Sequence, residues 1–525
     1  MKTLLLLFLL ISSIGFTQNF TITDQHHYGT PGWDVPIKTI KCQDGGFLTI
    51  ANSATSGNDK TQASFGGDDI WVIRLNADKT IRWEKTFGGD QDDASASVVE
   101  LVNEDILILG QTNSGISGNK TSGNYGNSDF WLLKLDASGT KIWEKNFGSS
   151  DLDSPSSILV MSPTNYLITG CSSGGISGTK TVPGYGEFDI WCIGIDSSGN
   201  EVWQEAYGGD SYDGNGGLVK DAAYKLQNGN VLLLSQSNSG VSGVKTSPNY
   251  GWEDNWLIEI NPSNGQLIQQ NNFGGSASDY LTGILQIGND IYLAGGSRSD
   301  VSGNKQSVLH GTLSAWLLKL DENLSVISDQ SFGGTTYSGF GGGIIRTNHG
   351  FIASGGCRND SNPWATRPVH GVLDIWIVGF DNSGNYQWNY SFGSATGSDG
   401  ITDVIETSNN HYTVSFVSNP LTNDGDLTVP NYGSYDLYLV DLDTDLGVSN
   451  LSADQFSIFP NPAINSISIN GINESAKYEI TDLHGKIIES GDYIGVIDVN
   501  KFNAGLYTIR IVSDSQTITK KWIKN

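Results

Sequence analysis

The sequence predicts an all-β protein that is built from a repeated unit. Its 525 residues include 66 Gly and only 2 Met, and 10% of them are aromatic. Abundant Gly together with aromatic and β-branched residues is typical of short strands that are joined by tight turns. A strand-like phrase also recurs about every sixty residues with an aromatic residue at its third position, namely Trp71, Trp131, Trp191, Trp256, Trp316, Trp376 and Tyr438.

Each repeat predicts four strands. The phrase DIWVIRL is followed by a turn and by a second strand that ends in an aromatic–Gly step, as at Phe87 and Gly88. Two more strands come from segments such as residues 97–112, where a VNED turn separates two apolar runs. Four short antiparallel strands per repeat are the signature of a β-propeller blade.

The ends of the repeat region predict seven blades and the closure of the ring. The last repeat, around residues 436–443, lacks a fourth strand, whereas residues 20–29 near the N-terminus resemble a fourth strand without its own repeat. An N-terminal strand that completes the last blade would leave no open sheet edge. We therefore expect a seven-bladed β-propeller over residues 19–446, a linker over 447–455 and a small β-sandwich over 456–525.

Residues 1–18 are typical of a secretory signal peptide. Lys2 precedes an apolar run from Leu4 to Ile11, and small and polar residues follow. This run is too short to span a membrane as a mature helix. No other long apolar run occurs, so we expect no transmembrane helix in the mature chain.

Net charge and cysteine usage narrow the choice of partners. The formal charge is −27 and the sequence pI is about 4.4, which disfavours binding to nucleic acid. The four cysteines have no CxxC spacing, so no metal centre is expected from them. We expect buried thiols, and a disulfide between Cys171 and Cys192 is the alternative.

The repeat resembles the SBBP-type propeller repeats of secreted bacterial proteins. Its turn LDASGTKIW, residues 135–143, also resembles the Trp-bearing turn of quinoprotein propellers and, loosely, the sialidase Asp-box. The spacing from Asp to Trp differs from both patterns. The resemblance therefore implies the fold and no catalytic residue.

The last 70 or so residues closely resemble the type A sorting domain of the bacterial type IX secretion system. The matching residues are Phe459, Pro460, Asn461, Pro462, Asp482, Leu483, Gly485, Lys486, Gly505, Leu506 and Tyr507, with a basic end that includes Lys520, Lys521 and Lys524. The resemblance implies a route through the periplasm and across the outer membrane, with the secretion machinery as a partner. The chain would then stay on the cell surface or be released.

Two rings of recurring residues are predicted on the face formed by the loops between second and third strands. An aromatic or His residue followed by Gly recurs six positions before the third-strand aromatic, at Phe65, Tyr125, Tyr185, Tyr250, His310, His370 and Tyr432. Lysines recur eleven positions before it, at Lys60, Lys120, Lys180, Lys245 and Lys305. We expect the aromatics to be packing plugs, although they could stack on sugar, and the lysines to bond loop carbonyls or nearby Asp.

A third, acidic ring is predicted in the loops between successive blades. It comprises Asp34, Asp93, Asp153, Asp213 and Asp279, with Ser338 and Ser398 breaking the series. These residues would accept backbone N–H bonds in tight turns. The alternative is a weak Ca²⁺ site, and no other cofactor is expected.

Blades five and six break the repeat pattern, which makes them the candidate ligand site. The residues concerned are Arg298, His310, Arg358, Trp364, Arg367 and His370. Arginines, histidines and a Trp on one sector suit an anionic or carbohydrate ligand. The alternative is sequence drift in which the arginines pair with Asp300 and Asp360.

No HExxH, GxSxG, P-loop or dinucleotide motif occurs in the sequence. We therefore expect a non-enzymatic surface protein that binds glycan or protein. Two alternatives remain open. One is a hydrolase or lyase that acts on polysaccharide, and the other is an accessory component of the secretion or surface machinery.

Overall fold

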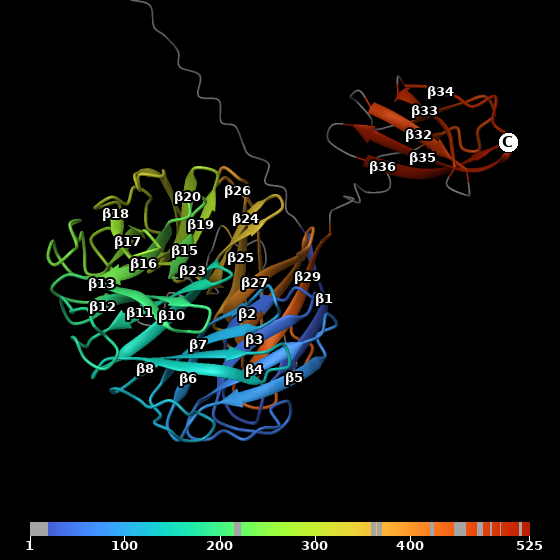
Figure 1. Ribbon diagram of the computed structural model, residues 1–525. Helices are drawn as coiled ribbons and strands as arrows, with labels where there is room; N and C mark the ends of the chain where they lie inside the picture. Colours follow the sequence, from blue (N-terminus) through green and yellow to red (C-terminus); the bar gives the residue numbers. More distant parts are fainter. Residues whose placement is uncertain are drawn as a thin grey trace, which may run out of the picture. The chain divides into compact units, whose positions relative to one another are not determined.

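Short strands joined by turns make up the described part of the chain, and no helix occurs in it. The computed structural model describes residues 19–214, 222–358, 364, 370–420, 425–445, 458–469, 476–482, 486–493, 495–513 and 517–525. Contacts divide the chain into one unit that contains Ile22–Asp443 and another that contains Thr444–Asn525. Figure 1 shows a ring of sheets in the first unit.

The described residues of the first unit form seven sheets, each of which is a blade. Blades one and two are β2 (Asp34–Lys41), β3 (Phe47–Ser53), β4 (Asp69–Leu75) and β5 (Ile81–Phe87), then β6 (Asp93–Glu100), β7 (Ile106–Thr112), β8 (Asp129–Leu135) and β9 (Lys141–Phe147). Blades three and four are β10 (Asp153–Ser162), β11 (Asn165–Ser172), β12 (Asp189–Asp196) and β13 (Glu201–Tyr207), then β14 (Asp213–Gly214), β15 (Ala223–Lys225), β16 (Val231–Ser237), β17 (Asp254–Ile260) and β18 (Leu267–Phe273).

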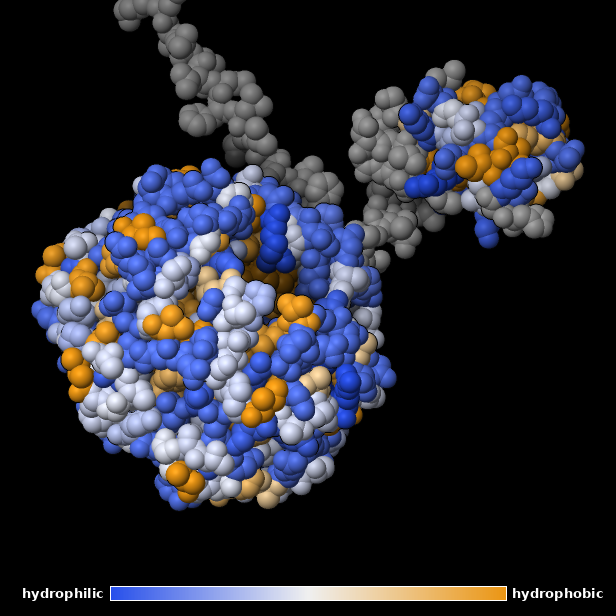
Figure 2. All heavy atoms as spheres, viewed as in Figure 1, coloured by the Kyte–Doolittle hydropathy of each residue, from blue (hydrophilic) through white to orange (hydrophobic). Residues whose placement is uncertain are grey.

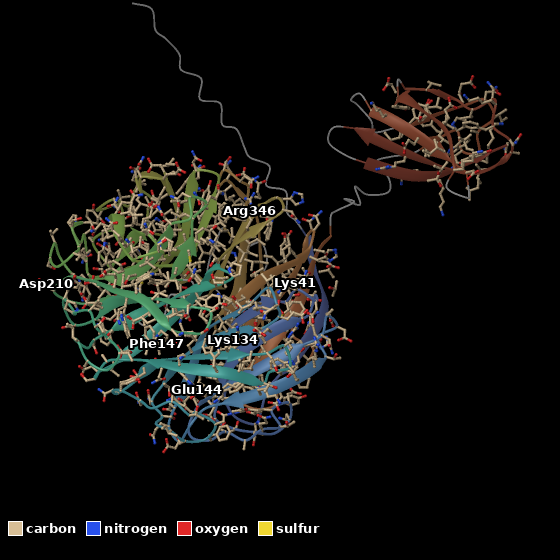
Figure 3. All side chains as sticks on the ribbon, viewed as in Figure 1. Lys41, Lys134, Glu144, Phe147, Asp210 and Arg346 are labelled. Carbon is tan, nitrogen blue, oxygen red and sulfur yellow. The ribbon has the colours of Figure 1, made fainter. Side chains whose placement is uncertain are left out.

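Blades five and six follow the same order of strands. They are β19 (Asp279–Ile287), β20 (Asp290–Ser297), β21 (Ser314–Leu320) and β22 (Val326–Phe332), then β23 (Ser338–Thr347), β24 (Gly350–Cys357), β25 (Asp374–Phe380) and β26 (Tyr386–Phe392). Every pair of neighbouring strands in these blades is antiparallel. Figure 3 shows the corresponding arrangement in blade two, where Lys134 and Glu144 lie on the neighbouring strands β8 and β9.

The seventh sheet combines the two ends of the repeat region. Its strands are β27 (Gly400–Ser408), β28 (His411–Ser418), β29 (Asp436–Asp445) and β1 (Asn19–Tyr28), in the order β1-β29-β28-β27. Blade seven also bonds to blade one, since the Thr39 N–H donates to Asp403 Oδ2 over 2.7 Å. Thr39 Oγ1 lies 2.8 Å from Ser415 Oγ.

The recurring tryptophans form the core between the blades. Trp71, Trp131, Trp191, Trp256, Trp316 and Trp376 are each 0% exposed. Five of these six indole N–H groups bond to polar residues on the outer strands, as from Trp71 to Glu84 over 3.1 Å and from Trp256 to Gln270 over 3.0 Å, and Trp131 is the exception. A buried indole needs such a partner, so this column of the repeat is structural.

The second unit forms two small sheets around one core. They are β30 (Ile458–Phe459), β31 (Ser466–Ile469) and β34 (Ile497–Asp498), then β33 (Ile487–Tyr493), β32 (Ala476–Thr481), β35 (Gly505–Ser513) and β36 (Thr517–Lys524). Ile467 and Ile497 of the first sheet pack in one cluster with Ile480, Ile509 and Trp522 of the second. Two sheets that share a core make a β-sandwich.

Two remaining predictions concern cysteines and membrane spans. All four cysteines are buried and none is joined in a disulfide, so the alternative of a Cys171–Cys192 bridge is wrong. No helix in the described part of the chain is long and apolar enough to cross a membrane. The predicted signal peptide and linker lie outside the described residues.

Candidate functional site

The loops between second and third strands and the loops between blades lie together at one end of the sheets, which we call the loop face. Backbone hydrogen bonds join the two kinds of loop. The Thr179 N–H of blade three donates to the Gly148 carbonyl of blade two over 2.8 Å, and the Asn304 N–H of blade five donates to the Gly274 carbonyl of blade four over 3.1 Å. At these junctions the loop of the following blade therefore lies over the junction.

The recurring lysines support these loops from inside. Lys60, Lys120, Lys180, Lys245 and Lys305 are at most 1% exposed. The Lys245 ammonium donates to the Ser239 carbonyl over 2.7 Å and to Ser237 Oγ over 2.8 Å. It also lies 5.9 Å from the centre of the Trp256 ring, and burial lowers its pKa. Such contacts fit the expected bonds to loop carbonyls.

The recurring aromatics each pack on one side and face solvent on the other. A Cβ atom on Gly178 would lie 2.9 Å from Tyr125 Cβ, and one on Gly303 would lie 2.9 Å from Tyr250 Cβ, so the following loop rests on the aromatic residue. Their exposed fractions nevertheless range from 39% for Tyr250 to 47% for Tyr125. The packed side fits a plug, and the open side leaves area for a ligand.

The predicted acidic ring lies in buried turns. Asp34, Asp93, Asp153, Asp213 and Asp279 are 0% exposed. Asp279 is representative, since its Oδ2 accepts the Gly275 N–H over 2.7 Å and the Ser299 hydroxyl over 2.7 Å. No group of three or more His, Cys, Asp or Glu that could hold a metal occurs in the described ranges. The contacts match the turn interpretation, and the Ca²⁺ site stays a prediction without support.

Asp399, and not the predicted Ser398, occupies the position of the acidic ring at the start of blade seven. The backbone N–H of Asp399 donates to the Leu373 carbonyl over 2.9 Å, which is the contact that the Asp93 N–H makes with the Asp68 carbonyl. Asp399 Oδ2 also accepts the Ser394 N–H over 2.8 Å. One extra residue in the loop displaces the Asp by one position, so the ring continues in this blade.

A second ring of Asp residues completes a buried pair at the junctions between blades. Asp69, Asp129, Asp189, Asp254, Asp374 and Asp436 begin the third strand of their blades and are at most 1% exposed. A Cβ atom on Gly274 would lie 2.0 Å from Asp254 Oδ1 and 3.0 Å from Asp279 Oδ2, which places the two carboxyl groups side by side. The Gly of the aromatic–Gly step is therefore required by the Asp pair.

Several carboxyl groups of the second Asp ring have raised pKa values. Burial, reinforced by the neighbouring Asp279, raises the pKa of Asp254 to about 6. Burial, reinforced by the neighbouring Asp153, raises the pKa of Asp129 to about 7. Neither Asp254 Oδ1 nor Asp279 Oδ1 has a hydrogen-bond partner among the described residues. A proton on Asp254 would remove one of the two buried charges.

The junction between blades five and six lacks this Asp pair. Ser314 stands at the position of Asp254, and Ser338 stands at the position of Asp279. Ser314 Oγ accepts the His310 N–H over 2.7 Å, just as Asp254 Oδ2 accepts the Tyr250 N–H over 2.5 Å. Two carboxyl groups are thus missing from one junction, and both are replaced by a neutral hydroxyl.

Arg298 and Arg358 lie beside this neutral junction. Both are exposed, and neither forms an ion pair with a described residue. Arg358 lies with its guanidinium carbon 5.6 Å from the centre of the Tyr337 ring. Burial and the neighbouring Tyr337 phenol raise the pKa of Tyr280, whereas Arg298 lowers it. A Cβ atom on Gly339 would lie 3.2 Å from Tyr280 Oη and 3.6 Å from Tyr337 Oη, so the two phenols lie close together. We call Arg298, Tyr280, Tyr337 and Arg358 the Arg–Tyr cluster.

The other predicted ligand residues have different surroundings. His310 and His370 are half-buried at plug positions, and the His370 N–H donates to Asp374 Oδ2 over 2.8 Å. Trp364 packs against the core, with its ring 5.2 Å from Phe332 and 5.5 Å from Tyr386. Arg367 lies outside the described residues.

Sequence reasoning missed three aromatic residues on this face. Tyr280 and Tyr337 lie in strand or turn positions that vary among the blades, so no recurring column marked them. Trp252 of blade four is 79% exposed. Its signal was present, because it is one of the few tryptophans outside the two repeated columns. Figure 2 shows that hydrophobic side chains lie mainly as separate patches on an otherwise hydrophilic surface.

The predicted sorting residues lie in the second unit. Asn461 Oδ1 accepts the Ile523 N–H over 2.9 Å, and Asp482 Oδ1 accepts the Lys486 N–H over 3.1 Å. Tyr507, which follows Gly505 in β35, stacks on Trp522 with the ring centres 5.3 Å apart. Gly485 lies outside the described residues. The second unit also contains the other predicted sorting residues, namely Phe459, Pro460, Pro462, Lys520 and Lys521.

The fold and the C-terminal unit together define an exported β-propeller protein with a sorting domain. Residues 457–525 match the secretion system C-terminal sorting domain family. This domain directs export through the type IX system to the cell surface or the medium. The type IX secretion machinery is therefore a partner of the chain.

Similar solved structures include several proteins with low sequence identity. The WD40 domain of Neurospora crassa Pan2 has a TM-score of 0.41 and 9% identity, with 81% of this chain and 96% of that chain covered. A mutant of the Synechocystis apocarotenoid oxygenase has a TM-score of 0.30 and 10% identity, with 76% and 90% covered. No curated protein sequence matches the chain.

Proposed function

We propose that the exported propeller is a non-enzymatic surface protein that binds a glycan or protein through its loop face. On this proposal a signal peptide takes the chain to the periplasm, and the sorting domain takes it across the outer membrane. The ligand is then met at the cell surface or outside the cell.

A row of exposed apolar residues on successive loops carries this proposal. The same loop position, four residues before the buried lysine, holds Ile116, Ile176, Val241 and Val301, which are exposed by 73%, 66%, 65% and 57%. Half-exposed aromatic rings recur in the same loops. Apolar side chains exposed at equivalent positions of four blades form a regular surface, and such surfaces commonly bind a partner.

The buried carboxyl pairs favour binding over hydrolysis. A general acid and base must reach the substrate, but the paired Asp residues are at most 1% exposed and accept backbone N–H bonds. These Asp residues therefore stabilise the turns and are not placed to act on a substrate.

The test compares two matched sets of substitutions. The loop-face set changes Ile116, Ile176, Val241 and Val301 to Ser. The control set changes Ile142, Val202, Ile268 and Ile327 to Ser; these residues lie on the fourth strands of the same blades and are 51%, 60%, 47% and 51% exposed. Binding to an array of glycans and surface proteins should be lost in the first set and kept in the second.

Three outcomes contradict the proposal. Equal loss in both sets places binding elsewhere on the blades. Release of reducing ends from a polysaccharide panel makes the protein a hydrolase or lyase. Absence of any ligand, together with co-purification of the chain with the outer-membrane secretion channel, makes it an accessory component.

A further inference from the structure

We propose that the Arg–Tyr cluster at the junction of blades five and six binds the acidic group of a saccharide, either a carboxylate or a sulfate. The proposal rests on glycan binding by the loop face and names the chemical class and the place. Arg298 and Arg358 supply the charge, and Tyr280 and Tyr337 supply phenol and ring contacts.

The first argument is the local charge balance. Five of the other junctions hold two Asp residues next to the loop that covers them, as Asp254 and Asp279 do, and the sixth holds Asp374 and Asp399. At the five–six junction both positions are Ser, and exposed arginines follow the second strands of the two blades that meet there, Arg298 in blade five and Arg358 in blade six. The loss of negative charge and the gain of positive charge therefore fall on the same two blades, in a protein whose formal charge is −27.

The second argument is that the predicted internal partner of Arg298 bonds elsewhere. Asp300 Oδ1 accepts the Leu309 N–H over 3.2 Å and forms no ion pair with Arg298. The other arginine, Arg358, lies against the Tyr337 ring and forms no ion pair with a described residue, and its predicted partner Asp360 lies outside the described residues. Neither guanidinium group has a carboxylate partner among the described residues, and an oxyanion ligand would supply the hydrogen-bond acceptors that they lack.

The third argument is the shape of the cluster. A Cβ atom on Gly296 would lie 2.7 Å from the Tyr280 ring, and one on Gly339 would lie 3.2 Å from Tyr280 Oη. Glycine at these two positions lets the Tyr280 ring lie close to blade five and reach blade six. The Tyr280 phenol is thereby held near the Tyr337 phenol.

Exposed aromatic area on the adjoining blade favours a saccharide over an acidic peptide. The Asp279 N–H bonds to the Glu253 carbonyl next to Trp252, and the Arg298 N–H bonds to the Ser278 carbonyl, so Trp252 and Arg298 flank one short loop. Trp252 is 79% exposed. An indole face beside a guanidinium group suits a sugar ring that carries an acidic substituent.

The experiment measures binding by calorimetry to the full exported chain. The probes are a glucuronate hexasaccharide, its neutral carboxyl-reduced counterpart, a sulfated hexasaccharide and a hexaglutamate peptide. The variants are Arg298→Gln with Arg358→Gln, and Ser314→Asp with Ser338→Asp, which restores the acidic pair of the other junctions. Arg82→Gln is the control, because Arg82 is an exposed arginine that pairs with Asp44 on blade one.

We expect an acidic hexasaccharide to bind, and its affinity to fall by about tenfold or more in both double variants. The control should bind as the unchanged protein does. The carboxylate and sulfate probes identify which acidic group is preferred. Thermal melting of each variant separates lost binding from lost folding, and if the Ser→Asp pair does not fold, the Arg→Gln pair decides.

Several results would overturn the inference. Acid-saccharide binding that survives both double variants removes the Arg–Tyr cluster from the site. Equal affinity for the neutral counterpart removes the acidic group from recognition, and tighter binding of hexaglutamate replaces the saccharide with an acidic peptide. In each case binding through the loop face can still hold, since none of these results is among the three outcomes that contradict that proposal.

Discussion

At the scale of single residues, the Asp pairs explain why Gly follows the last aromatic residue at the junctions that hold such a pair. Asp254 and Asp279 occupy the space where a side chain on Gly274 would point. The two Asp oxygens that bond to the turns also need backbone N–H donors four residues away. One pair therefore constrains a glycine, two turns and the approach of neighbouring blades.

Replacing Gly274 with Ala should destabilise the propeller strongly. The new methyl group would lie 2.0 Å from Asp254 Oδ1, so the junction must open, at a cost of about 1–3 kcal/mol or more in the free energy of unfolding. Gly115→Ala is the control, because no atom lies within 4 Å of the added carbon. Chemical denaturation of both variants measures the difference in the free energy of unfolding. Equal stabilities would show that the Asp254–Asp279 pair moves aside at little cost.

Replacing Asp254 with Asn should stabilise the protein at pH 8. The amide keeps an acceptor for the Tyr250 N–H and removes a buried charge, since the pKa of Asp254 is raised to about 6. The melting temperature should rise by about 1–3 °C at pH 8 and by less at pH 5, where Asp254 is already protonated. Asp136→Asn should have the opposite sign at pH 8, because hydrogen bonds from Ser138 and Thr140 lower the pKa of Asp136.

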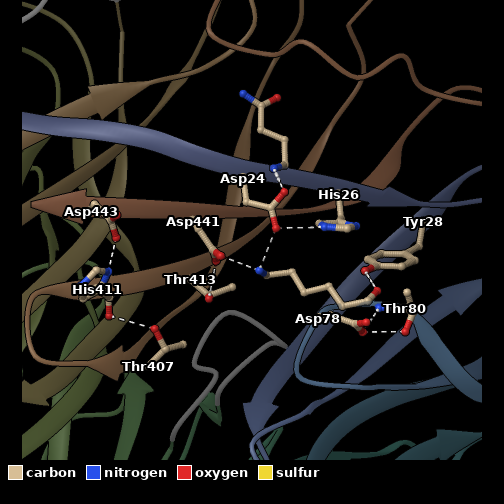
Figure 4. A network of polar contacts seen from close by, with 12 residues as sticks. Asp24, His26, Tyr28, Asp78, Thr80, Thr407, His411, Thr413, Asp441 and Asp443 are labelled. Carbon is tan, nitrogen blue, oxygen red and sulfur yellow. Dashed lines mark hydrogen bonds and ion pairs between the residues drawn. The ribbon is translucent and has the colours of Figure 1, made fainter.

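At the scale of elements, a buried lysine ties the N-terminal strand to the ring. Lys79 lies in the turn between β4 and β5 and is 5% exposed. Its ammonium contacts Asp24 of β1 over 3.3 Å and Asp441 of β29 over 2.5 Å, as the network in Figure 4 shows. Its carbonyl accepts the Tyr28 hydroxyl over 2.5 Å. One turn of blade one thus bonds to the two outer strands of blade seven.

Replacing Lys79 with Met should loosen that closure. Two carboxylates would lose their shared cation, at a cost of about 1–3 kcal/mol because both remain partly exposed. Hydrogen exchange should speed up mainly in β1 and β29. Lys134→Met is the control, since Lys134 pairs with Asp105 inside blade two. Equal exchange in the two variants would argue against a special role for the Lys79 network.

At the scale of the whole molecule, raised carboxyl pKa values recur in several blades, and their effects on stability add. Burial raises the pKa of five carboxyl groups of the second Asp ring to about 6 or 7, namely Asp69, Asp129, Asp189, Asp254 and Asp436. Each group binds its proton more tightly when folded than when unfolded. Their contribution to stability is therefore complete below about pH 4 and is lost as the pH rises through 6 to 7.

Stability should accordingly fall between pH 5 and pH 8. Exposed turn carboxyls such as Asp136 and Asp196 have lowered pKa values, so their contribution is lost only as the pH falls below about 4. The two effects together place maximal stability between about pH 4 and pH 6. Denaturation midpoints measured across this range test the prediction, and a steady rise from pH 5 to pH 8 would refute it.

The propeller and the sorting domain could be predicted from the sequence because their signals are local. The strand phrases, the aromatic–Gly step and the buried Trp column repeat with a constant spacing, and each is encoded within one blade. Arg298 and Arg358 could also be singled out, since they depart from an otherwise regular column. Local sequence determines strands, turns and exceptions to a repeat.

Only the tertiary structure decided which residues meet between blades. Tyr280 and Tyr337 lie far apart in the sequence, and Ser314 and Ser338 belong to different repeats, so no motif joins them. Trp364 has the character of a ligand residue in the sequence but packs against Phe332 in the core. Contacts across a junction depend on how neighbouring sheets pack, and that packing is a property of the closed ring of blades.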